Sequence, residues 1–140
     1  MNETCPTGSF QRTSKRGRRK VSKITHIEIA GVDGYKLQAF YGKLFGWDIS
    51  RREVGGFDYH DVDVTGSPTV GIRHEPKGPP EIVVYVEVND LDRSVEKAVA
   101  LGGSIRIPPK QHGDLHFALI RDPEDNPVGL TEKPVGESGA

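Results

Sequence analysis

The feature that most constrains the fold is an internal repeat within the 140-residue sequence. The segment HIEIAGVD at 26–33 aligns with YVEVNDLD at 85–92 at an offset of 59 residues, and TVGI at 69–72 aligns with PVGL at 127–130 at an offset of 58. A single change in loop length accounts for the one-residue difference. Repetition of a long unit outweighs local propensity as a guide to architecture, so the sequence predicts two copies of one supersecondary unit.

The first copy has the signals of a strand, a helix and three further strands. Alternation over 24–30 predicts a half-buried strand with His26 and Glu28 on one face. Asp33 then offers a cap for a helix that Gly46 ends. The apolar stripe expected on this helix consists of Leu37, Phe40, Tyr41, Leu44 and Phe45. The three strands expected after it lie at about 47–54, 57–64 and 69–74.

The second copy repeats this order. Residues 82–88 predict a strand, Asp90 or Asp92 offers the cap of a second helix, and Gly102-Gly103 end that helix. The apolar residues expected on this helix are Leu91, Val95, Ala98, Val99 and Leu101. The strands expected after it lie near 104–107, 115–121 and 127–132.

Charge divides the chain into a basic tail and an acidic body. Residues 1–23 carry a net charge of +6, and the rest of the chain carries −7. We therefore expect a disordered basic tail at 1–23, one domain at 24–133 and a flexible C-terminus at 134–140. An acidic domain is a poor general binder of polyphosphate, so no specific nucleic-acid partner is expected. No apolar run is long enough to cross a bilayer, and no secretory leader is visible. Cys5 is the single cysteine, so no internal disulfide is expected. These features predict a cytoplasmic protein without a membrane partner.

Two motifs give the repeat a family resemblance. FYGKLFGW (40–47) closes the first helix, and DPEDNPVGL (122–130) enters the last strand. With the paired β-α-β-β-β units, they resemble the vicinal oxygen chelate superfamily (glyoxalase I, bleomycin-resistance proteins, extradiol dioxygenases), especially its short glyoxalase-like members. The resemblance implies an α+β fold in which two βαβββ modules form one curved eight-stranded mixed sheet with helices on the outer face. Asp125 stands where the family has glycine, and Asp125-Asn126 can still make the turn because both residues tolerate a left-handed conformation.

The resemblance also implies where a metal would bind. In the metal enzymes of the superfamily, four side chains from the first and last strand of each module hold a divalent ion. The corresponding residues here are His26, Gly71, Tyr85 and Gly129. Glycine has no side chain to donate and a neutral tyrosine is a poor ligand near pH 7, so we expect no metal and no other cofactor. A rebuilt site of His26, Glu28 and Glu87 stays open as an alternative.

The same face supplies the candidate functional residues. His26, Glu28 and Glu87 are candidate catalytic acid–base groups, although Glu28 and Glu87 also have a structural interpretation as partners of Arg73 and Arg121. The candidates for ligand binding are Tyr85, Gly71, Gly129, Arg73, Tyr59 and Phe117, with Phe57 and Trp47 as further wall residues. The other histidines, His60, His112 and His116, are expected to be surface or structural residues.

These residues predict a protein that binds a small organic molecule in a cupped pocket without a transition metal, with a second copy of the chain as a partner in a homodimer. Replacement of two carboxylates by Gly71 and Gly129 would leave room for a larger or flatter ligand, with backbone close to it. The alternative is a lyase or isomerase of the vicinal oxygen chelate type that uses acid–base residues or a nonstandard metal site. The sequence leaves open whether the protein is an enzyme.

Overall fold

The computed structural model describes residues 21–54, 57–66 and 68–133, and the repeat is present in it as two βαβββ units. Most of the basic tail and the whole C-terminal segment 134–140, about which the sequence made predictions, lie outside the described residues. The elements of the first unit are β1 (Ile24–Gly31), α1 (Gly34–Phe45), β2 (Asp48–Val54), β3 (Phe57–Asp63) and β4 (Thr69–His74). Those of the second are β5 (Glu81–Val88), α2 (Leu91–Ala100), β6 (Ser104–His112), β7 (Leu115–Arg121) and β8 (Pro127–Glu132).

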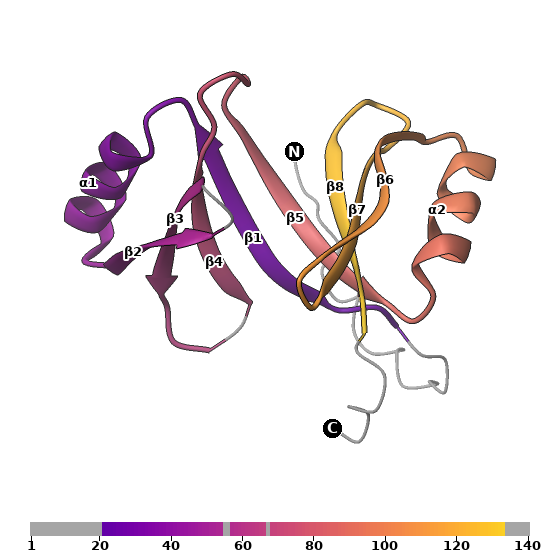
Figure 1. Cartoon of the computed structure of the whole chain (residues 1–140), viewed down its shortest axis with the longest axis horizontal. Helices are drawn as coiled ribbons and strands as arrows, with labels where there is room; N and C mark the ends of the chain where they lie inside the picture. Colours follow the sequence, from indigo (N-terminus) through magenta and orange to yellow (C-terminus); the bar gives the residue numbers. More distant parts are fainter. Residues whose placement is uncertain (1–20, 55–56, 67, 134–140) are drawn as a thin grey trace, which may run out of the picture.

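All eight strands belong to one mixed sheet, in the order β2-β3-β4-β1-β5-β8-β7-β6. The pairs β1/β4 and β5/β8 are parallel, and the other neighbours are antiparallel. Figure 1 shows β1 and β5 side by side in the middle of the molecule, with α1 and α2 at its two ends. His26 pairs with Tyr85, its equivalent in the repeat, so the approximate two-fold axis passes between these residues. The predicted fold is confirmed.

The helices start and stop where the sequence predicts, for the expected reasons. The Asp33 carboxylate accepts hydrogen bonds from the backbone N–H groups of Tyr35 and Lys36, and Gly46 ends α1 with φ of 73°. Of the two candidate caps of α2, Asp90 is the one that accepts from the backbone, at Arg93. The turn before β8 also forms as expected, because Asp125 adopts a left-handed φ of 73°.

Strand β6 is longer than predicted and extends to His112 instead of ending near 107. The sequence places Pro108-Pro109 in this stretch, which argues against a strand interior because proline has no N–H to donate. In the structure β6 is an edge strand, and its register with β7 shifts between Ile105 and Ile107 and again between Ile107 and Lys110. An edge position with irregular pairing accommodates both prolines.

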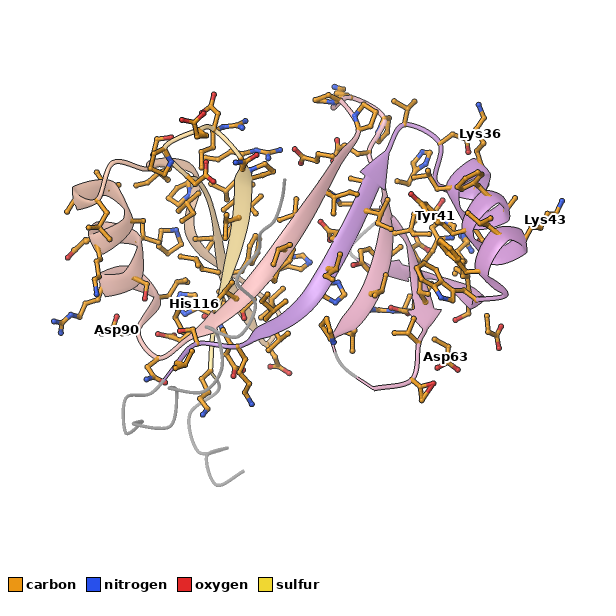
Figure 2. All side chains as sticks on the ribbon, turned by 180° about the vertical axis from the view of Figure 1, so that it is seen from behind. Lys36, Tyr41, Lys43, Asp63, Asp90 and His116 are labelled. Atoms are coloured by element: carbon orange, nitrogen blue, oxygen red, sulfur yellow. The ribbon has the colours of Figure 1, made fainter. Side chains whose placement is uncertain are left out.

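Each helix packs on one face of its half of the sheet and covers a small apolar core. The first core contains Ile29, Val62 and Ile72, and the second contains Leu91, Val95, Ala118, Ile120 and Leu130. Tyr41 packs on the first core, and Figure 2 shows it on the sheet side of α1, whereas Lys36 and Lys43 point away.

The predicted stripe of α1 is only partly buried. Phe40, Leu44 and Phe45 are each more than half exposed, and Val99 and Leu101 of the second unit are exposed as well. Trp47, a predicted wall residue of the cup, instead stacks on Tyr41 and lies at a tilt against Phe45 on the helix side. Trp47 precedes β2, which begins at Asp48, and it packs on the helix-side core together with Ile49.

The other face of the curved sheet, which the two helices leave uncovered, is the concave one, and an ion pair spans part of it. Arg106 on β6 binds the carboxylate of Glu81 on β5 through two hydrogen bonds of 3.0 and 2.9 Å. Strands β7 and β8 lie between these two residues, so the contact joins strands that are three strand spacings, or about 14 Å, apart in the sheet. In the described ranges, no helix is long and apolar enough to span a bilayer.

His60 provides a test of the packing between α1 and the sheet. Its side chain is fully buried, Nδ1 contacts the amide oxygen of Gln38 at 2.8 Å, and Nε2 has no hydrogen-bond partner among the described residues. Burial lowers the pKa of His60, although the neighbouring carboxylates of Asp58 and Asp61 oppose this shift. The native state therefore favours the neutral imidazole.

We predict that His60 makes the protein less stable in acid. Because its folded-state pKa lies below the unfolded value of about 6.5, its contribution is complete above that pH and is lost as the pH falls below it. Urea unfolding at pH 7.5 and 5.5 should show a smaller loss of stability in His60→Gln than in the wild type, by at most about 1.4 kcal/mol per pH unit. Equal losses in the two proteins would contradict this assignment.

Candidate functional site

The candidate site lies on the concave face, where β1, β4, β5 and β8 lie side by side. His26 on β1 pairs with Tyr85 on β5, and Tyr85 pairs with Gly129 on β8. On the other side, Glu28 of β1 pairs with Gly71 of β4. Of the four positions that correspond to metal ligands in the superfamily, His26, Tyr85 and Gly129 are therefore adjacent, and Gly71 lies two residues along β4 from Thr69, the partner of His26. We call His26, Glu28, Tyr59, Arg73 and Tyr85 the floor cluster.

Two tyrosine rings cover the two glycines of the site. A Cβ atom at Gly71 would overlap the phenol of Tyr59, with two ring carbons only 2.5 Å away. A Cβ atom at Gly129 would overlap the ring of Tyr85 in the same way, with Cγ at 2.8 Å. Gly71 and Gly129 thus accommodate neighbouring aromatic side chains. From the sequence we expected an open floor at these glycines. The structure corrects this expectation, because the rings of Tyr59 and Tyr85 fill the space that the missing side chains leave.

Glu28 is the central charged group of the floor cluster. Only 7% of the residue is exposed, and its carboxylate lies 3.3 Å from the hydroxyl of Tyr59 and 3.4 Å from that of Tyr85. The Nε atom of Arg73 lies 3.4 Å from the same carboxylate. Burial, reinforced by the charge of Glu28, raises the pKa of both tyrosines, so both hydroxyls stay protonated.

His26 joins the cluster through both ring nitrogens. Its Nδ1 lies 2.6 Å from the hydroxyl oxygen of Thr69, and its Nε2 lies 2.8 Å from the hydroxyl of Tyr59. Burial lowers the pKa of His26, and the carboxylates of Glu28 and Asp61 oppose the shift. A neutral imidazole at pH 7 follows from a pKa below the ordinary 6.5.

Arg73 connects the floor cluster to the second module. Its guanidinium group lies within 3.5 Å of the carboxylates of Glu28, Glu75 and Glu81, and Glu81 in turn binds Arg106. The two hydrogen bonds from Arg106 are the main reason why the pKa of Glu81 is lowered. The predicted pairing of Glu28 with Arg73 is therefore present, and it belongs to a network that crosses from β4 to β6.

Two of the predicted site residues, Glu87 and Phe117, do not join this cluster. Glu28 follows His26 by two residues, and Glu87 follows Tyr85 by two residues. Because β1 and β5 are antiparallel, Glu28 and Glu87 lie in opposite directions from the His26–Tyr85 pair. Glu28 pairs with Val83, four residues or about 13 Å from Glu87. Phe117 pairs with Thr131, which also pairs with Glu87, so both lie toward the other end of the face. The rebuilt set of His26, Glu28 and Glu87 is therefore not assembled.

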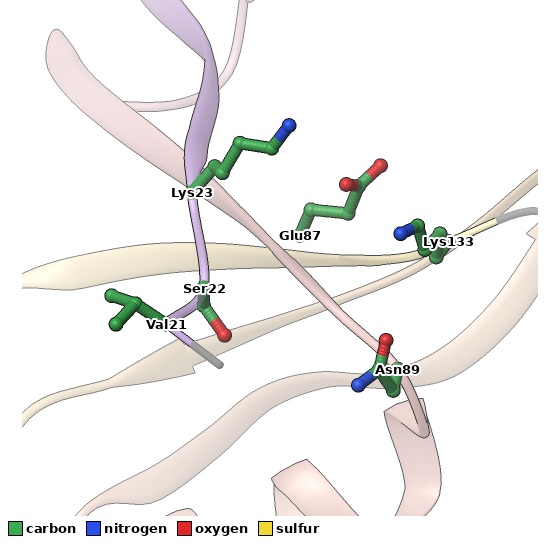
Figure 3. A pocket seen from close by; sticks show the side chains of 6 residues that line it. All are labelled: Val21, Ser22, Lys23, Glu87, Asn89 and Lys133. Carbon is green, nitrogen blue, oxygen red and sulfur yellow. The ribbon is translucent and has the colours of Figure 1, made fainter. Parts of the chain in front are cut away.

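Glu87 instead lines a small cavity near the start of the described chain. Figure 3 shows Glu87 with Lys23 and Lys133 around it, and the cavity volume is about 120 Å³. The predicted partner Arg121 binds the backbone carbonyl of Asp125. The side chain of Phe57, a predicted wall residue, lies outside the described part of the structure.

The residues at the floor do not fit the metal that the superfamily resemblance implies. Across residues 21–54, 57–66 and 68–133, no group of three or more His, Cys, Asp or Glu side chains is arranged to hold a metal ion. Of the four inherited positions, His26 alone offers an imidazole, and the hydroxyl of Tyr85 stays protonated. A neutral phenol and two glycines cannot replace two carboxylates and an imidazole.

Sequence reasoning identified every member of the floor cluster but missed how the cluster is connected. His26 contacts Thr69 and Glu81 contacts Arg106, and the two residues of each pair are distant in the sequence. Neither contact has an equivalent in the other copy of the repeat, so the repeat gave no sign of them. His60 and His116 were correctly expected to be structural. His60 contacts Gln38. His116 pairs with Glu132 at 2.7 Å, and the Glu132 carboxylate also accepts a hydrogen bond from the backbone N–H of Leu91.

A family model described as "Glyoxalase-like domain" matches residues 26–131. Among curated proteins, "Putative glyoxylase CFP32" of Mycobacterium bovis and its counterpart in Mycobacterium tuberculosis are 30% identical over 124 residues, which cover 83% of this chain and 48% of theirs. The chain thus spans about half the length of the curated relatives it matches.

Solved structures share the fold at low sequence identity. A hypothetical protein of Bacillus halodurans is 13% identical with a TM-score of 0.62, over 81% of this chain and 96% of its own. The methylmalonyl-CoA epimerase of Mycobacterium tuberculosis is 18% identical with a TM-score of 0.57, over 84% and 91%. A glyoxalase/bleomycin resistance protein/dioxygenase superfamily member from Vibrio splendidus is 14% identical with a TM-score of 0.56, over 81% and 100%.

The packing of tyrosine on glycine leads to a mutational prediction. Gly71→Ala should lower the free energy of unfolding by about 1–3 kcal/mol, because the new methyl group overlaps the ring of Tyr59. The same change in a Tyr59→Ala background should cost much less, a coupling that denaturant unfolding of the four proteins measures. Gly42→Ala is the control, since a Cβ atom there meets its nearest neighbour at an ordinary 3.5 Å within α1. Additive effects of Gly71→Ala and Tyr59→Ala would contradict the proposed overlap.

Proposed function

The chain belongs to the glyoxalase-like domain family, and from that premise we propose that it binds a small organic ligand on the concave face, over the floor cluster, without a transition metal. The observation that carries the proposal is the buried carboxylate of Glu28 between two tyrosine hydroxyls and a guanidinium group. A few polar groups that converge beside aromatic rings on a concave surface are typical of ligand sites. Residues with perturbed pKa values at the same place support this interpretation.

The aromatic side chains favour a ligand with a flat or apolar part. Tyr59 and Tyr85 lie on either side of His26, with ring centroids 6.4 and 5.8 Å from the imidazole. These rings offer contact area, while their hydroxyl groups and Glu28 offer orientation through hydrogen bonds. A methylmalonyl-CoA epimerase with this fold has been solved in complex with methylmalonyl-CoA, which supports use of the same scaffold for a small ligand here.

The alternative function is a lyase or isomerase, and one set of contacts favours it. The hydroxyl of Tyr59 lies 2.8 Å from the imidazole of His26 and 3.3 Å from the carboxylate of Glu28. A neutral imidazole, a phenol and a carboxylate in hydrogen-bond reach can exchange a proton with a substrate. The acid–base pair is then His26 and Glu28, with Glu87 too far away to take part directly. A homodimer and a cytoplasmic location stay predictions.

Ligand binding is tested by thermal shift with a library of aromatic metabolites and antibiotics. We expect at least one compound to raise the melting temperature of the wild type in a concentration-dependent manner, because a ligand that binds the folded state stabilises it. The shift should be lost in Tyr85→Ala and kept in Glu87→Gln, whose side chain lies at the other end of the concave face. A shift that survives Tyr85→Ala, or a library without any hit, would count against the proposed site.

Metal independence needs its own measurement. Elemental analysis of the purified protein should find less than stoichiometric zinc, nickel, iron or manganese, and a chelator should leave the ligand-induced thermal shift unchanged. Stoichiometric metal that is lost in His26→Ala would overturn this part of the proposal. In that event the lyase or isomerase with a nonstandard metal site becomes the preferred function.

A further inference from the structure

A row of paired residues crosses the concave face from the first module to the second. It joins one residue from each of β4, β1, β5, β8, β7 and β6, in the order Thr69, His26, Tyr85, Gly129, Leu119 and Ile107. Residues that pair across neighbouring strands share one face of a sheet. The whole row therefore lies on the concave face, with His26 and Tyr85 of the floor cluster.

The row changes from polar to apolar at Tyr85. At the first-module end, Oγ1 of the exposed Thr69 lies 2.6 Å from Nδ1 of the half-buried His26. At the second-module end, Leu119 is 3% exposed and Ile107 is half-buried, and both side chains are purely aliphatic. The ring of Tyr85 lies between the two ends, over a glycine. The row thus offers hydrogen bonds at one end and apolar contact at the other.

The two copies of the repeat differ in the same direction on strands β3 and β7. Asp61 and Leu119 are equivalent, because each pairs with the glycine on the last strand of its module. Tyr59 and Phe117, two residues earlier on these strands, are equivalent in the same register. The second copy therefore has a phenyl ring in place of a phenol and an aliphatic side chain in place of a carboxylate. The change in polarity belongs to the modules as a whole and extends beyond one row.

The apolar end of the face continues along β7 toward the turn that joins it to β6. Phe117 is half-buried, and Leu115, which follows the same alternation, is 46% exposed. The alternate residues of β7, Ala118 and Ile120, belong to the helix-side core instead. Apolar surface that water still reaches stabilises a complex when a ligand covers it.

The polar end of the face favours a group that forms hydrogen bonds. Arg52 lies over the ring of Tyr59, 5.5 Å from its centroid, and pairs with Asp61. An apolar group placed there would remove these charges and His26 from water without any replacement for the lost hydrogen bonds, which costs free energy. A hydroxyl or amide group would replace them.

We propose that the concave face takes an amphipathic ligand, with its hydrogen-bonding head at Thr69 and His26 and its apolar or aromatic tail at Leu119 and Phe117. The inference rests on the proposed function, and it names the ligand class and the orientation in that same site. The reverse orientation would cover polar side chains with the tail and place the head beside apolar ones, at a cost to both ends. The long axis of the ligand thus crosses β1 and β5, with Tyr85 beneath its middle.

Orientation is tested with 3-phenylpropan-1-ol, which has a hydroxyl head and a phenyl tail. NMR titration of backbone amides along β1, β5 and β7 of the full chain gives its dissociation constant. Intermolecular NOE contacts should join the phenyl protons to the methyl groups of Leu119, and the carbinol protons to the methyl group of Thr69. Propan-1-ol, which lacks the ring, should bind about tenfold more weakly, because it covers no apolar surface on β7.

Variants then test the two ends of the site. Phe117→Ala should weaken the binding of 3-phenylpropan-1-ol about fivefold, because the tail loses its aromatic contact. Phe40→Ala, a matched change on the exposed side of α1, should leave the affinity unchanged. A double change, Tyr59→Phe with Asp61→Leu, gives the first module the residues of the second. In that variant the phenyl protons should contact β3 as well as β7.

The outcomes separate this inference from the function on which it rests. Phenyl contacts at Thr69 in the wild type, or an affinity that Phe117→Ala leaves unchanged, overturn the inference while ligand binding stands. Phenyl contacts that stay confined to β7 in the double variant also overturn it, as does a metabolite that binds over the floor cluster when 3-phenylpropan-1-ol does not. Failure of this probe and of the whole library to perturb the concave face overturns the inference and the proposed function together.

Discussion

A buried carboxylate is the constraint on which the concave face depends. An ionised group withdrawn from water is tolerated only where opposite charge or hydrogen-bond donors surround it. Glu28 meets that requirement with Arg73 and two tyrosine hydroxyls, all at 3.3 to 3.4 Å. Arg73 in turn reaches Glu81, and Glu81 holds Arg106 on the far edge strand. The need to neutralise one side chain therefore connects the two modules across the face that the helices leave uncovered.

The glycines of the floor illustrate how a scaffold position can be reused. The superfamily resemblance implies metal-binding side chains at the positions of Gly71 and Gly129. Here both residues carry no side chain, and the rings of Tyr59 and Tyr85 lie over them. Close packing of an aromatic ring on strand glycines stabilises a sheet where glycine by itself would weaken it. Metal-binding side chains are thus replaced by the phenol groups of Tyr59 and Tyr85. These groups stay neutral and can donate hydrogen bonds to Glu28 or to a ligand.

The site is asymmetric although the chain is a repeat. His26 and Tyr85 are equivalent in the alignment of the two copies, as are Glu28 and Glu87. Glu28 and Glu87 lie toward opposite ends of antiparallel strands, and only Glu28 reaches the floor cluster, because Tyr59 and Arg73 lie at its end. The repeat therefore provides the frame, and differences between its copies provide the chemistry. This asymmetry is compatible with a ligand that has no two-fold symmetry of its own.

The sequence by itself determined the architecture. Strand alternation and the helix caps at Asp33 and Asp90 are local patterns, and the aligned strand-to-helix segments recur at an offset of 59 residues. It also determined which face most strand residues take, since strand parity fixes the face of each side chain, and Trp47 departed from the prediction because it precedes β2. Tertiary structure decided which of these residues meet. Strand direction separated Glu87 from Glu28, the strand order of the sheet put Arg106 within reach of Glu81, and ring packing placed Tyr59 over Gly71. These outcomes depend on distances between strands that are remote in the chain, and no spacing within the sequence encodes such distances.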